Sequence, residues 1–546
     1  MIIYKEPFEK AMCQRACPAG IDIPRYIRLI GEGKFDEALA VIRERLPFAS
    51  VCGYVCYHPC EAKCQRGEVG GPMAIKALKR FVAEKGSSIS IPESVVAKSM
   101  GKVVAVVGSG PAGLTAAYYL AKLGHAVTVF EMLPEPGGMM RIGIPRYRLP
   151  QHVLDAEINF IRQAGVNIKT NNRVESLEKL FEQGYNAVFL AMGAHQCQKM
   201  GIEGEDTPAV VEGLSFLKDV NLGLKVSLGD KVAVVGGGNA AIDAARTALR
   251  LGAKEVTVLY RRSWNEMPAN QTEVEEALFE GVKIQFLTAP IRINRANAKV
   301  RMECIHTKLG AVDTSGRKRS EPISGSEFTI EVDKVISAIG QTPNIPNQFR
   351  LTMGDGSTIQ VAPNTLATGR AGVFAGGDAV SGPASVIEAV ASGRQAAISI
   401  DHYLGGKGMM EEVIGPSQKV APQRLRLPVA NRVAISTLPL QERLRDFSEV
   451  EFTLDEQKAI EEAKRCLWCD LPIRVETEKC TGCRTCQVRC SVINLGEFNP
   501  FKSFITITRD HGKRTTNLRF SDECKNCGLC ISVCNYGALT RANQDI

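Results

Sequence analysis

Two runs of four cysteines near the C-terminus constrain the fold more than any other feature of the chain. They share one spacing, Cys480-x₂-Cys483-x₂-Cys486-x₃-Cys490 and Cys524-x₂-Cys527-x₂-Cys530-x₃-Cys534. This spacing is typical of domains that hold two [4Fe–4S] clusters, in which the fourth cysteine of each run ligates the cluster of the other run. We therefore expect a domain built around two such clusters, with zinc as the alternative metal.

The predicted ligand sets cross between the two runs. One cluster is expected to use Cys480, Cys483, Cys486 and Cys534, and the other Cys490, Cys524, Cys527 and Cys530. The proline that usually follows the fourth cysteine is absent, because Ser491 and Asn535 occupy those positions. The spacing still predicts an α+β domain of the bacterial ferredoxin type over residues 475–546.

Cysteine usage also bears on the cellular compartment and on charge. The chain has 18 cysteines, nearly all of them in clusters. No apolar run is long enough to span a bilayer and no secretion pattern is visible, so we expect a cytoplasmic protein in which clustered cysteines indicate metal or redox chemistry.

The formal net charge of +8 counts the cysteines as neutral. Cluster-bound thiolates would cancel that charge, which therefore gives no case for nucleic-acid binding. Cys197 and Cys304 are expected to be ordinary structural cysteines.

Residues 1–85 are expected to form a helical domain with two further cysteine groups, Cys13-x₃-Cys17 and Cys52-x₃-Cys56-x₃-Cys60-x₃-Cys64. These six cysteines are two short of two complete four-thiolate sites, and Cys466-Leu-Trp-Cys469 supplies the missing number. We infer that residues 406–474 form an arm that returns Cys466 and Cys469 to the N-terminal domain, and that residues 86–100 are a linker. Structural zinc is again the alternative.

The stretch from Val103 to Glu131 carries the dinucleotide-binding pattern. A β-branched run ends in Gly108-x-Gly110-x-x-Gly113, an alanine-rich helical pattern follows, and a second strand ends at Glu131. The glycines let the backbone approach a pyrophosphate at a helix N-terminus, and the acid can accept hydrogen bonds from a ribose. Residues 101–225 are therefore predicted as the first part of a Rossmann-type domain.

A second motif, Gly236-Gly-Gly238-Asn239-Ala240, follows a strand that begins at Lys231 and predicts a dinucleotide-binding domain over residues 226–342. Where an acid would contact a ribose, this domain has Arg261 and Arg262. Arginines at this place suit a 2′-phosphate and favour NADP(H), although NAD(H) stays open. The alternative is that one or both arginines are solvated.

The chain then returns to the first domain. A predicted strand over residues 332–339 and Gly340 lead into residues 343–405, the second part of that domain, so the second domain is inserted in the first. Gly376-Gly377-Asp378 precedes a helical pattern in this part. A helix N-terminus there would stabilise the negative charge of a reduced flavin.

Taken together, these motifs resemble the glutamate synthase small-subunit family of flavin oxidoreductases over about residues 5–405. The matching stretches are Cys13-x₃-Cys17-Pro18, the Cys56–Cys64 run, Gly108-Ser-Gly-Pro-Ala-Gly113, Gly143-Ile-Pro145, Gly236-Gly-Gly-Asn239, Tyr260-Arg-Arg-Ser-x-x-Glu266-Met-Pro268 and Gly376-Gly-Asp378. Similar modules occur in the electron-entry half of dihydropyrimidine dehydrogenase and in ferredoxin:NADP transhydrogenases. Family members usually begin with a further Cys-x₂-Cys, which this chain lacks and which Cys466-Leu-Trp-Cys469 resembles.

The resemblance implies FAD at the first nucleotide motif, NADP or NAD at the second, and two [4Fe–4S] clusters in the N-terminal domain. The implied FAD contacts are Gly108, Gly110, Pro111, Ala112, Gly113, Glu131, Gly138, Arg148, Gly193, Gly377, Asp378, Ser385 and Val386. The implied NAD(P) contacts are Gly236, Gly238, Asn239, Ala240, Arg261, Arg262 and Gly340. One N-terminal cluster would use Cys13, Cys64, Cys466 and Cys469, and the other Cys17, Cys52, Cys56 and Cys60.

The features together predict a multidomain oxidoreductase: an α-helical N-terminal iron–sulfur domain, two α/β Rossmann-type domains and a C-terminal ferredoxin-like domain. We expect an electron-transfer subunit that moves electrons, in either direction, between NAD(P)H and a partner protein through FAD and four [4Fe–4S] clusters. No protein acid or base is expected at the hydride step. The partner would be a catalytic subunit in a hetero-oligomer, or free ferredoxin. The alternatives are a stand-alone NAD(P)H:ferredoxin oxidoreductase, with or without bifurcation, and a zinc-stapled nucleotide-binding scaffold.

Overall fold

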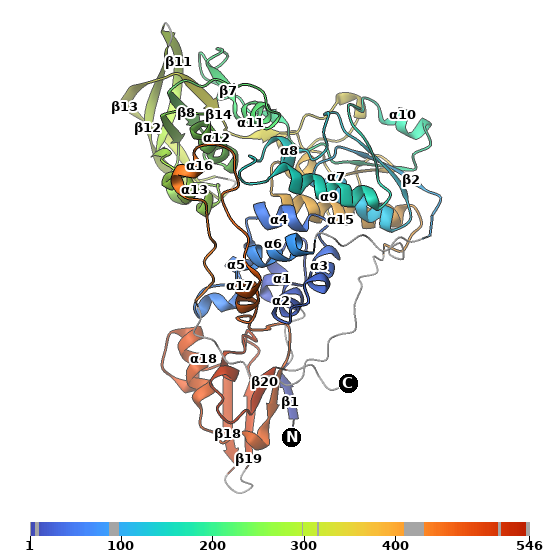
Figure 1. The fold of residues 1–546 in the computed structure, drawn as a ribbon, viewed down its shortest axis with the longest axis vertical. Helices are drawn as coiled ribbons and strands as arrows, with labels where there is room; N and C mark the ends of the chain where they lie inside the picture. The colour runs from blue at the N-terminus through green and yellow to red at the C-terminus, as the bar shows by residue number, and fades with distance from the viewer. Residues whose placement is uncertain are drawn as a thin grey trace. The chain divides into compact units, whose positions relative to one another are not determined.

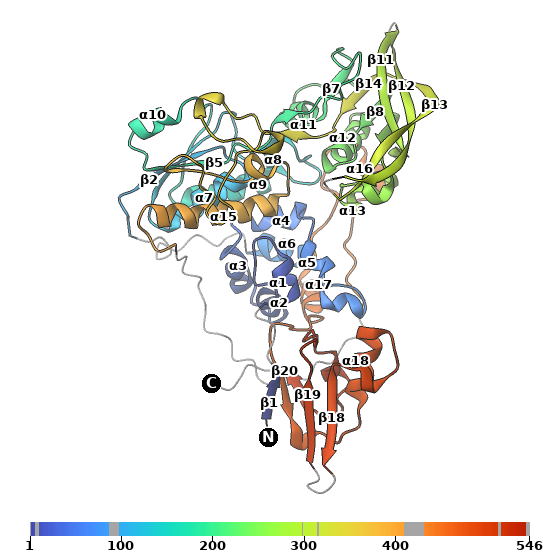
Figure 2. The same ribbon diagram turned by 180° about the vertical axis from the view of Figure 1, so that it is seen from behind.

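The computed structural model describes residues 2–5, 10–86, 98–296, 299–313, 316–408, 431–510 and 515–541. The chain forms two compact units (Figure 1, Figure 2). The α/β unit comprises Ser90–Met410 and Ser436–Phe452, and the cysteine-rich unit comprises Met1–Ile89, Glu411–Ile435 and Thr453–Ile546. Among the described residues, no helix has both the length and the apolar character needed to cross a bilayer.

The first nucleotide-binding fold of the α/β unit is built on a parallel five-stranded sheet. Its strands lie in the order β16 (Val373–Ala375), β5 (Ala187–Leu190), β2 (Val103–Val107), β3 (Ala126–Phe130) and β4 (Asn167–Lys169). The apolar central strands are almost wholly buried, as expected for a parallel sheet with both faces covered. The helices of this fold are α7 (Pro111–Lys122), α8 (Met139–Ile142), α9 (Gln151–Gln163), α10 (Leu177–Glu182), α14 (Asp378–Ser381) and α15 (Val386–Tyr403).

Helices α7 and α15 pack closely against each other (Figure 1). Gly393, in the middle of α15, makes this possible, because a Cβ atom there would lie 2.2 Å from the carbonyl oxygen of Ala112. The contact brings the N-terminal half of α15 beside the first turn of α7, the turn that follows the first glycine motif.

The second nucleotide-binding fold has its own parallel sheet. The strand order is β10 (Lys283–Phe286), β9 (Glu255–Tyr260), β8 (Lys231–Val235), β14 (Lys334–Ser337) and β7 (Val210–Glu212). Helices α11 (Gly213–Asn221), α12 (Asn239–Arg250) and α13 (Gln271–Phe279) belong to this fold. An antiparallel sheet of β11 (Thr288–Ala296), β12 (Lys299–Val312) and β13 (Lys318–Val332) extends it, and no motif in the sequence indicates this sheet.

The second fold begins earlier in the chain than residue 226, where the sequence placed its start. Strand β7 already pairs with β14, and the chain crosses between the two folds at β6 (Gln196–Cys197) and β15 (Gln341–Thr342), which pair with each other. Strand β7 has only three residues, so its apolar run is too short to be recognised from periodicity.

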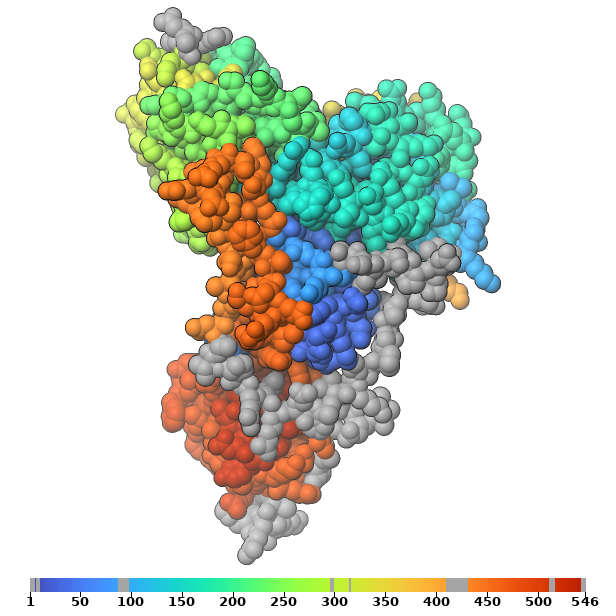
Figure 3. Space-filling model, viewed as in Figure 1, coloured from blue at the N-terminus to red at the C-terminus, as the bar shows by residue number. Residues whose placement is uncertain are grey.

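A segment of the predicted arm, Ser436–Phe452, belongs to the α/β unit rather than to the N-terminal cysteine domain. It contains α16 (Leu440–Arg443) and lies against the second nucleotide-binding fold, where Figure 3 shows it in orange beside the green surface. Buried Arg443 forms ion pairs there with Glu276 and Glu280 of that fold. Residues 409–430 of the predicted arm lie outside the described residues.

The cysteine-rich unit begins, after residue 10, with a helical domain. Its helices are α1 (Met12–Ala16), α2 (Ile23–Gly31), α3 (Phe35–Arg43), α4 (Ala49–Val55), α5 (Pro59–Ala62) and α6 (Ile75–Lys85), and α17 (Glu456–Ala463) packs on α2 and α6 from the other end of the sequence. Residues 87–97 of the predicted linker lie outside the described residues.

The C-terminal part of this unit is a small α+β domain. It contains α18 (Thr485–Leu495), α19 (Leu529–Ser532) and the antiparallel pair β18 (Ile505–Asp510) and β19 (Thr515–Phe520). A second sheet has β17 (Ile473–Glu476) between β20 (Leu539–Arg541) and β1 (Ile2–Lys5). The N-terminal residues therefore supply a strand to the C-terminal domain, where the sequence predicted only helices for residues 1–85.

Candidate cofactor sites

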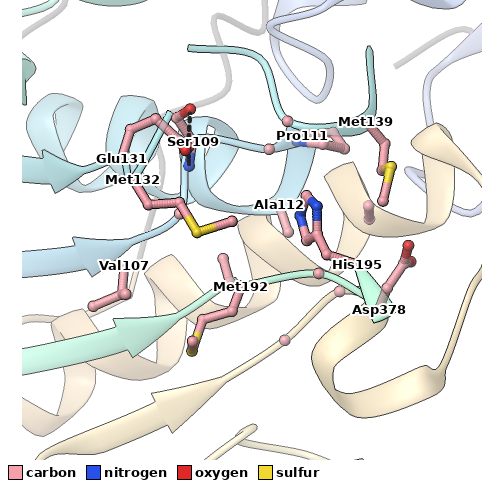
Figure 4. A pocket seen from close by; sticks show the side chains of 18 of the residues that line it. Val107, Ser109, Pro111, Ala112, Glu131, Met132, Met139, Met192, His195 and Asp378 are labelled. Carbon is pink, nitrogen blue, oxygen red and sulfur yellow. Dashed lines mark hydrogen bonds between the residues drawn. The ribbon is translucent and has the colours of Figure 1, made fainter. Parts of the chain in front are cut away.

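A cavity of about 230 Å³ lies at the carboxyl ends of four strands of the first parallel sheet (Figure 4). Its walls include Val107, Phe130, Ala191 and Gly376, which end or follow β2, β3, β5 and β16. Ligands of open α/β sheets bind at such carboxyl ends. The same cavity collects most of the predicted FAD contacts: Gly108, Gly110, Pro111, Ala112, Glu131, Gly138, Gly193, Gly377, Asp378, Ser385 and Val386.

The first glycine motif shapes one wall of the cavity. Gly108 has φ +102°, and a Cβ atom there would lie 2.4 Å from the carbonyl oxygen of Ala191. At Gly113 a Cβ atom would meet the carbonyl oxygen of Gly108 at 2.0 Å, so this glycine packs the helix against the turn instead of lining the cavity. Gly110 caps α7 and has open space where a Cβ would stand. The open helix N-terminus fits a pyrophosphate group.

Glu131 is buried and faces the first glycine motif (Figure 4). Its Oε2 atom accepts hydrogen bonds from the backbone N–H of Ser109, at 2.9 Å, and from the Ser109 hydroxyl, at 2.5 Å. Its Oε1 atom accepts one from the backbone N–H of Leu133, at 2.8 Å. The carboxylate is thus held rigidly in the cavity wall, where its remaining lone pairs could accept ribose hydroxyl groups.

The opposite wall is formed by Asp378 and the start of α15. Burial raises the pKa of Asp378 to about 6, although its Oδ1 atom accepts a hydrogen bond from the backbone N–H of Ala384 at 3.2 Å. Ser385 caps α15, and Glu388 completes a capping box. The N-terminus of this long helix would stabilise negative charge in the cavity.

Several residues that line the cavity were not predicted. They are Ser109, Met132, Met139, Asn172, Arg173, Met192, His195, Asn344 and Pro346, among others. Burial lowers the pKa of His195, with Glu131 acting in the opposite direction and Lys218 in the same one. Most of these residues lie in loops that follow the strands, where no spacing rule marks them in one sequence.

Two predicted FAD contacts, Gly113 and Arg148, do not line the cavity. Gly113 packs helix α7 against the turn, and Arg148 lies at the second nucleotide-binding fold. Its guanidinium pairs with Asp243 of α12 at 2.8 Å and with Glu273 of α13 at 3.1 Å. Arg148 therefore connects the first nucleotide-binding fold to the second and does not line the cavity.

The second glycine motif has the same construction as the first. Gly236 has φ +142°, and a Cβ atom there would lie 2.2 Å from the carbonyl oxygen of Ala338. Gly238 caps α12 and has open space where a Cβ would stand, and Asn239 and Ala240 form the first turn. Gly340 follows β14 with φ +140°. This second open helix N-terminus fits the pyrophosphate of a nicotinamide dinucleotide.

The two arginines after β9 differ sharply in their surroundings. Arg261 is exposed. Arg262 is buried, and its Nη2 atom lies 2.6 Å from Oδ2 of Asp313, with which it forms an ion pair. Because the charge of Arg262 is already matched by a carboxylate, Arg261 is the better placed of the two to meet a 2′-phosphate.

The sixteen clustered cysteines all lie in the cysteine-rich unit, and we group them here by the four predicted ligand sets. We number them as quartet 1 (Cys17, Cys52, Cys56, Cys60), quartet 2 (Cys13, Cys64, Cys466, Cys469), quartet 3 (Cys490, Cys524, Cys527, Cys530) and quartet 4 (Cys480, Cys483, Cys486, Cys534). All members of quartets 2 and 4 line small hollows, one for each quartet. In the part of the chain that the structure describes, no three His, Cys, Asp or Glu side chains are arranged to hold a single metal ion.

Contacts across the sequence bring Cys466 and Cys469 to the N-terminal helices. Arg28 of α2 pairs with Asp470 at 2.6 Å, and Glu462 of α17 accepts a hydrogen bond from the backbone N–H of Ala74 at 2.8 Å. Arg465 donates to the carbonyl oxygen of Gly70 at 2.7 Å. The Cys466-Leu-Trp-Cys469 turn thus lies beside the N-terminal helices, the place to which the predicted arm returns it.

The thiol environments suit a positively charged metal core. Burial raises the pKa of Cys466 to about 12. The pKa of Cys13 is raised well above its usual value by burial and then by the neighbouring Cys466, Cys469, Cys64 and Cys60. Thiolates that are disfavoured by burial and by one another are stabilised by a bound cationic core, so the quartets fit [4Fe–4S] clusters.

The quartets form one series. Electrostatic interactions link Cys60 of quartet 1 to Cys13 of quartet 2, Cys469 of quartet 2 to Cys527 of quartet 3, and Cys530 of quartet 3 to Cys486 of quartet 4. Between quartets 2 and 3, the side-chain amide of Asn526 donates hydrogen bonds to the carbonyl oxygens of Cys469 and Leu471, at 3.0 and 2.9 Å. Quartet 4, at the end of the series, contains the exposed Cys483.

Family models match three parts of the chain. Residues 102–393 match the pyridine nucleotide-disulphide oxidoreductases. Residues 8–90 match the 4Fe–4S cluster domain II of dihydropyrimidine dehydrogenase, and residues 479–538 match a 4Fe–4S dicluster domain. Both cysteine-rich matches are therefore to iron–sulfur domains.

Three proteins are similar to this chain over long alignments. The NADP(+)-dependent formate dehydrogenase subunit beta of Moorella thermoacetica is 44% identical over 86% of this chain and 71% of its own length. The NADPH-Fe(3+) oxidoreductase subunit beta of Geobacter sulfurreducens is 40% identical over 84% of this chain and 75% of its own. The glutamate synthase [NADPH] small chain of Escherichia coli is 34% identical over 72% of this chain and 88% of its own. The chain therefore belongs to the pyridine nucleotide-disulphide oxidoreductase family, among the glutamate synthase small chain-like enzymes that carry 4Fe–4S domains.

Proposed function

We propose that this chain is the electron-transfer subunit of a larger oxidoreductase and that it moves electrons between NADPH and a partner protein through FAD and four [4Fe–4S] clusters. The continuous series of four cysteine quartets carries the proposal. A protein that only bound a nucleotide would have no use for such a series. The relatives from Moorella thermoacetica and Geobacter sulfurreducens support the proposal, because both are named as beta subunits of NADP-linked enzymes.

FAD bound in the cavity would take a hydride from the nicotinamide and release its two electrons singly to iron–sulfur carriers. The chain supplies binding and orientation. The backbone of Gly108–Ala112 and the α7 N-terminus would bind the pyrophosphate, and Glu131 the adenosine ribose. Asp378 and the N-terminus of α15 would orient the flavin end.

The second fold would bind the dinucleotide. Its Gly236–Ala240 turn would bind the pyrophosphate, and Arg261 would bind the 2′-phosphate. In the proposed layout the FAD fold consists of the segments before β6 and after β15, and the NADPH fold is the insertion between them. No protein acid or base is required at the hydride step.

The ferredoxin-like end of the series would exchange electrons with the partner. Cys483 is the exposed member of quartet 4. In the same domain Phe498 is 81% exposed and Phe501 is 80% exposed. Large exposed aromatic side chains are typical of protein interfaces. The partner is a catalytic subunit of a hetero-oligomer or a free ferredoxin.

Metal and flavin analysis of the anaerobically purified native protein tests the proposal. We expect about 16 iron atoms per chain, bound FAD, and loss of the flavin absorbance on addition of NADPH. Zinc in place of iron, or a flavin that NADPH does not reduce, would end the proposal. Identification of the proteins that copurify then distinguishes a subunit from a free NAD(P)H:ferredoxin oxidoreductase.

A further inference from the structure

Lys79 of α6 is a buried lysine beside a cysteine quartet. Only 6% of the residue is exposed. Lysine is rarely buried without a compensating charge. The charges that act on Lys79 are those of Cys56, Cys52, Cys60 and Cys17, the four members of quartet 1. Lys79 is therefore a cation whose compensating groups are proposed cluster ligands.

The packing of two helices puts Lys79 in this place. Helices α4 and α6 lie side by side (Figure 1, Figure 2). They approach closely at Gly53, where a Cβ atom would lie 2.7 Å from the Cα atom of Arg80. Cys52 precedes Gly53 and Lys79 precedes Arg80, so this close contact brings the lysine and the cysteine to neighbouring positions.

The neighbouring cation, Arg80, is balanced in a different way. Its guanidinium stacks on the Tyr54 ring with a centroid distance of 3.8 Å, and its Nε atom donates a hydrogen bond to Oε1 of Glu84 at 2.7 Å. A carboxylate therefore matches the charge of Arg80, whereas thiolates match the charge of Lys79.

Lysine side chains are ordinarily positively charged at neutral pH. The ammonium group of Lys79 can therefore interact electrostatically with a cluster held by quartet 1.

We propose that Lys79 sets the reduction potential of the cluster held by quartet 1, by placing a fixed positive charge beside it. Reduction adds one negative charge to a cluster, and a nearby cation in a buried site stabilises that charge. Lys79 therefore raises the reduction potential of this cluster above the value that the same four thiolates would give without it. The inference rests on the proposed function, because it requires a cluster in quartet 1.

The position of quartet 1 gives this tuning a purpose. Quartet 1 lies at the end of the series away from quartet 4, the ferredoxin-like end. A raised potential at this end would make the quartet 1 cluster a better acceptor for electrons that enter the series there. Lys79 would act through the cluster, so it is a positioning residue and not a catalytic one.

Redox titration of the holoprotein, followed by electron paramagnetic resonance, tests the proposal. The variant Lys79→Met removes the charge and keeps an unbranched side chain only one atom shorter, and Lys79→Arg keeps the charge. Lys85→Met is the matched control, because Lys85 lies on the same helix with its side chain 52% exposed and 3.1 Å from Glu456.

In Lys79→Met we expect one cluster to become harder to reduce, with the ratio of reduced to oxidised cluster at the wild-type midpoint falling about tenfold, a shift of about 59 mV. Lys79→Arg and Lys85→Met should keep the wild-type potentials. Unchanged potentials in Lys79→Met with full iron content would overturn the proposal. Loss of about four iron atoms from that variant would also overturn it, in favour of a structural role. An iron-free wild-type protein would instead reject the proposed function.

Discussion

Arg261 and Arg262 are equivalent in the sequence but have different roles in the structure. Arg261→Ala should raise the KM for NADPH about tenfold to a hundredfold and leave the KM for NADH unchanged, because it removes one charge-assisted contact to the 2′-phosphate. Steady-state kinetics with an artificial electron acceptor measure both constants. An unchanged preference for NADPH would contradict the assignment.

Arg262→Ala is the companion variant. It should lower the free energy of unfolding by up to about 3 kcal/mol, because it leaves Asp313 without its buried ion-pair partner. Denaturant unfolding measures this loss. A variant that loses NADPH preference but no stability would reverse the roles given to the two arginines.

Asp378 makes the stability of the flavin-free protein depend on pH. Its folded-state pKa is raised from 3.8 to about 6 by burial, so the folded protein holds the proton more tightly than the unfolded chain. The contribution is fully present below the unfolded pKa and is lost as pH rises through the folded pKa. Between these values the stability should fall by at most about 1.4 kcal/mol per pH unit relative to Asp378→Asn. Parallel unfolding curves of the two proteins at pH 4 and pH 7 measure this difference; equal pH dependence would refute it.

For single residues, the sequence identified members of the site better than the side chains with which they interact. Gly108, Glu131 and Asp378 were predicted at the cavity because their motifs have fixed spacing. The ion pair of Arg262 depends on Asp313, which follows strand β12 and lies 51 residues later in the chain, and no local pattern encodes that pair. His195 was missed for the same reason, because the loop after β5 carries no motif that marks its side chain.

Among the elements, the Ser436–Phe452 segment packs on the second nucleotide-binding fold. Arg443 is buried and pairs with Glu276 and Glu280, and Glu280 also accepts hydrogen bonds from Arg246 and Arg250 of α12. Despite burial, these hydrogen bonds lower the pKa of Glu280 to about 2. A buried ionic network therefore connects this segment to the second nucleotide-binding fold.

Arg443→Met should lower the free energy of unfolding of the α/β unit by about 3 kcal/mol, because it removes one partner from buried charges. Arg445→Met, two residues later and exposed, is the control and should change stability by less than about 0.5 kcal/mol. Thermal unfolding followed by flavin release compares the two. Equal losses would show that Arg443 contributes no more than a surface charge.

The Cys466–Cys469 turn is the element that joins the two ends of the sequence. Cys466→Ser should reduce the iron content from about 16 to about 12 atoms per chain, because one of four clusters loses a ligand. Cys197→Ser should retain the full content, since Cys197 lies outside every quartet. Iron and sulfide assays decide this. Full iron content in Cys466→Ser would remove Cys466 from quartet 2.

The sequence predicted elements that carry a motif and missed several elements that carry none. The strands before both glycine motifs follow from their apolar runs, and the cysteine spacing predicted the α+β domain at the C-terminus. Strand β7 has three residues and β1 has four, too few to show a period. The sheet of β11, β12 and β13 is stabilised by pairing between strands, and its residues alternate on a partly exposed surface without any chemical motif.

At the scale of the whole molecule, residues from opposite ends of the sequence come together in one cysteine quartet and in one sheet. Quartet 2 takes cysteines from both ends of the sequence, and strand β1 from the N-terminus completes a C-terminal sheet. The N-terminal helices and the ferredoxin-like domain therefore fold as one cysteine-rich unit. This arrangement places quartets 1 and 2, which lie in the helical domain, in the same compact unit as quartets 3 and 4.

Anaerobic titration of the purified holoprotein with NADPH, followed together by optical absorbance and electron paramagnetic resonance, tests the electron-transfer function most directly. FAD alone can hold about two electrons. We predict that each chain takes up more electrons than this, and that signals of reduced [4Fe–4S] clusters grow as the flavin absorbance falls. A protein that stops at two electrons per chain, with its flavin reduced and no iron–sulfur signal, would contradict the proposed path from NADPH through FAD to the clusters.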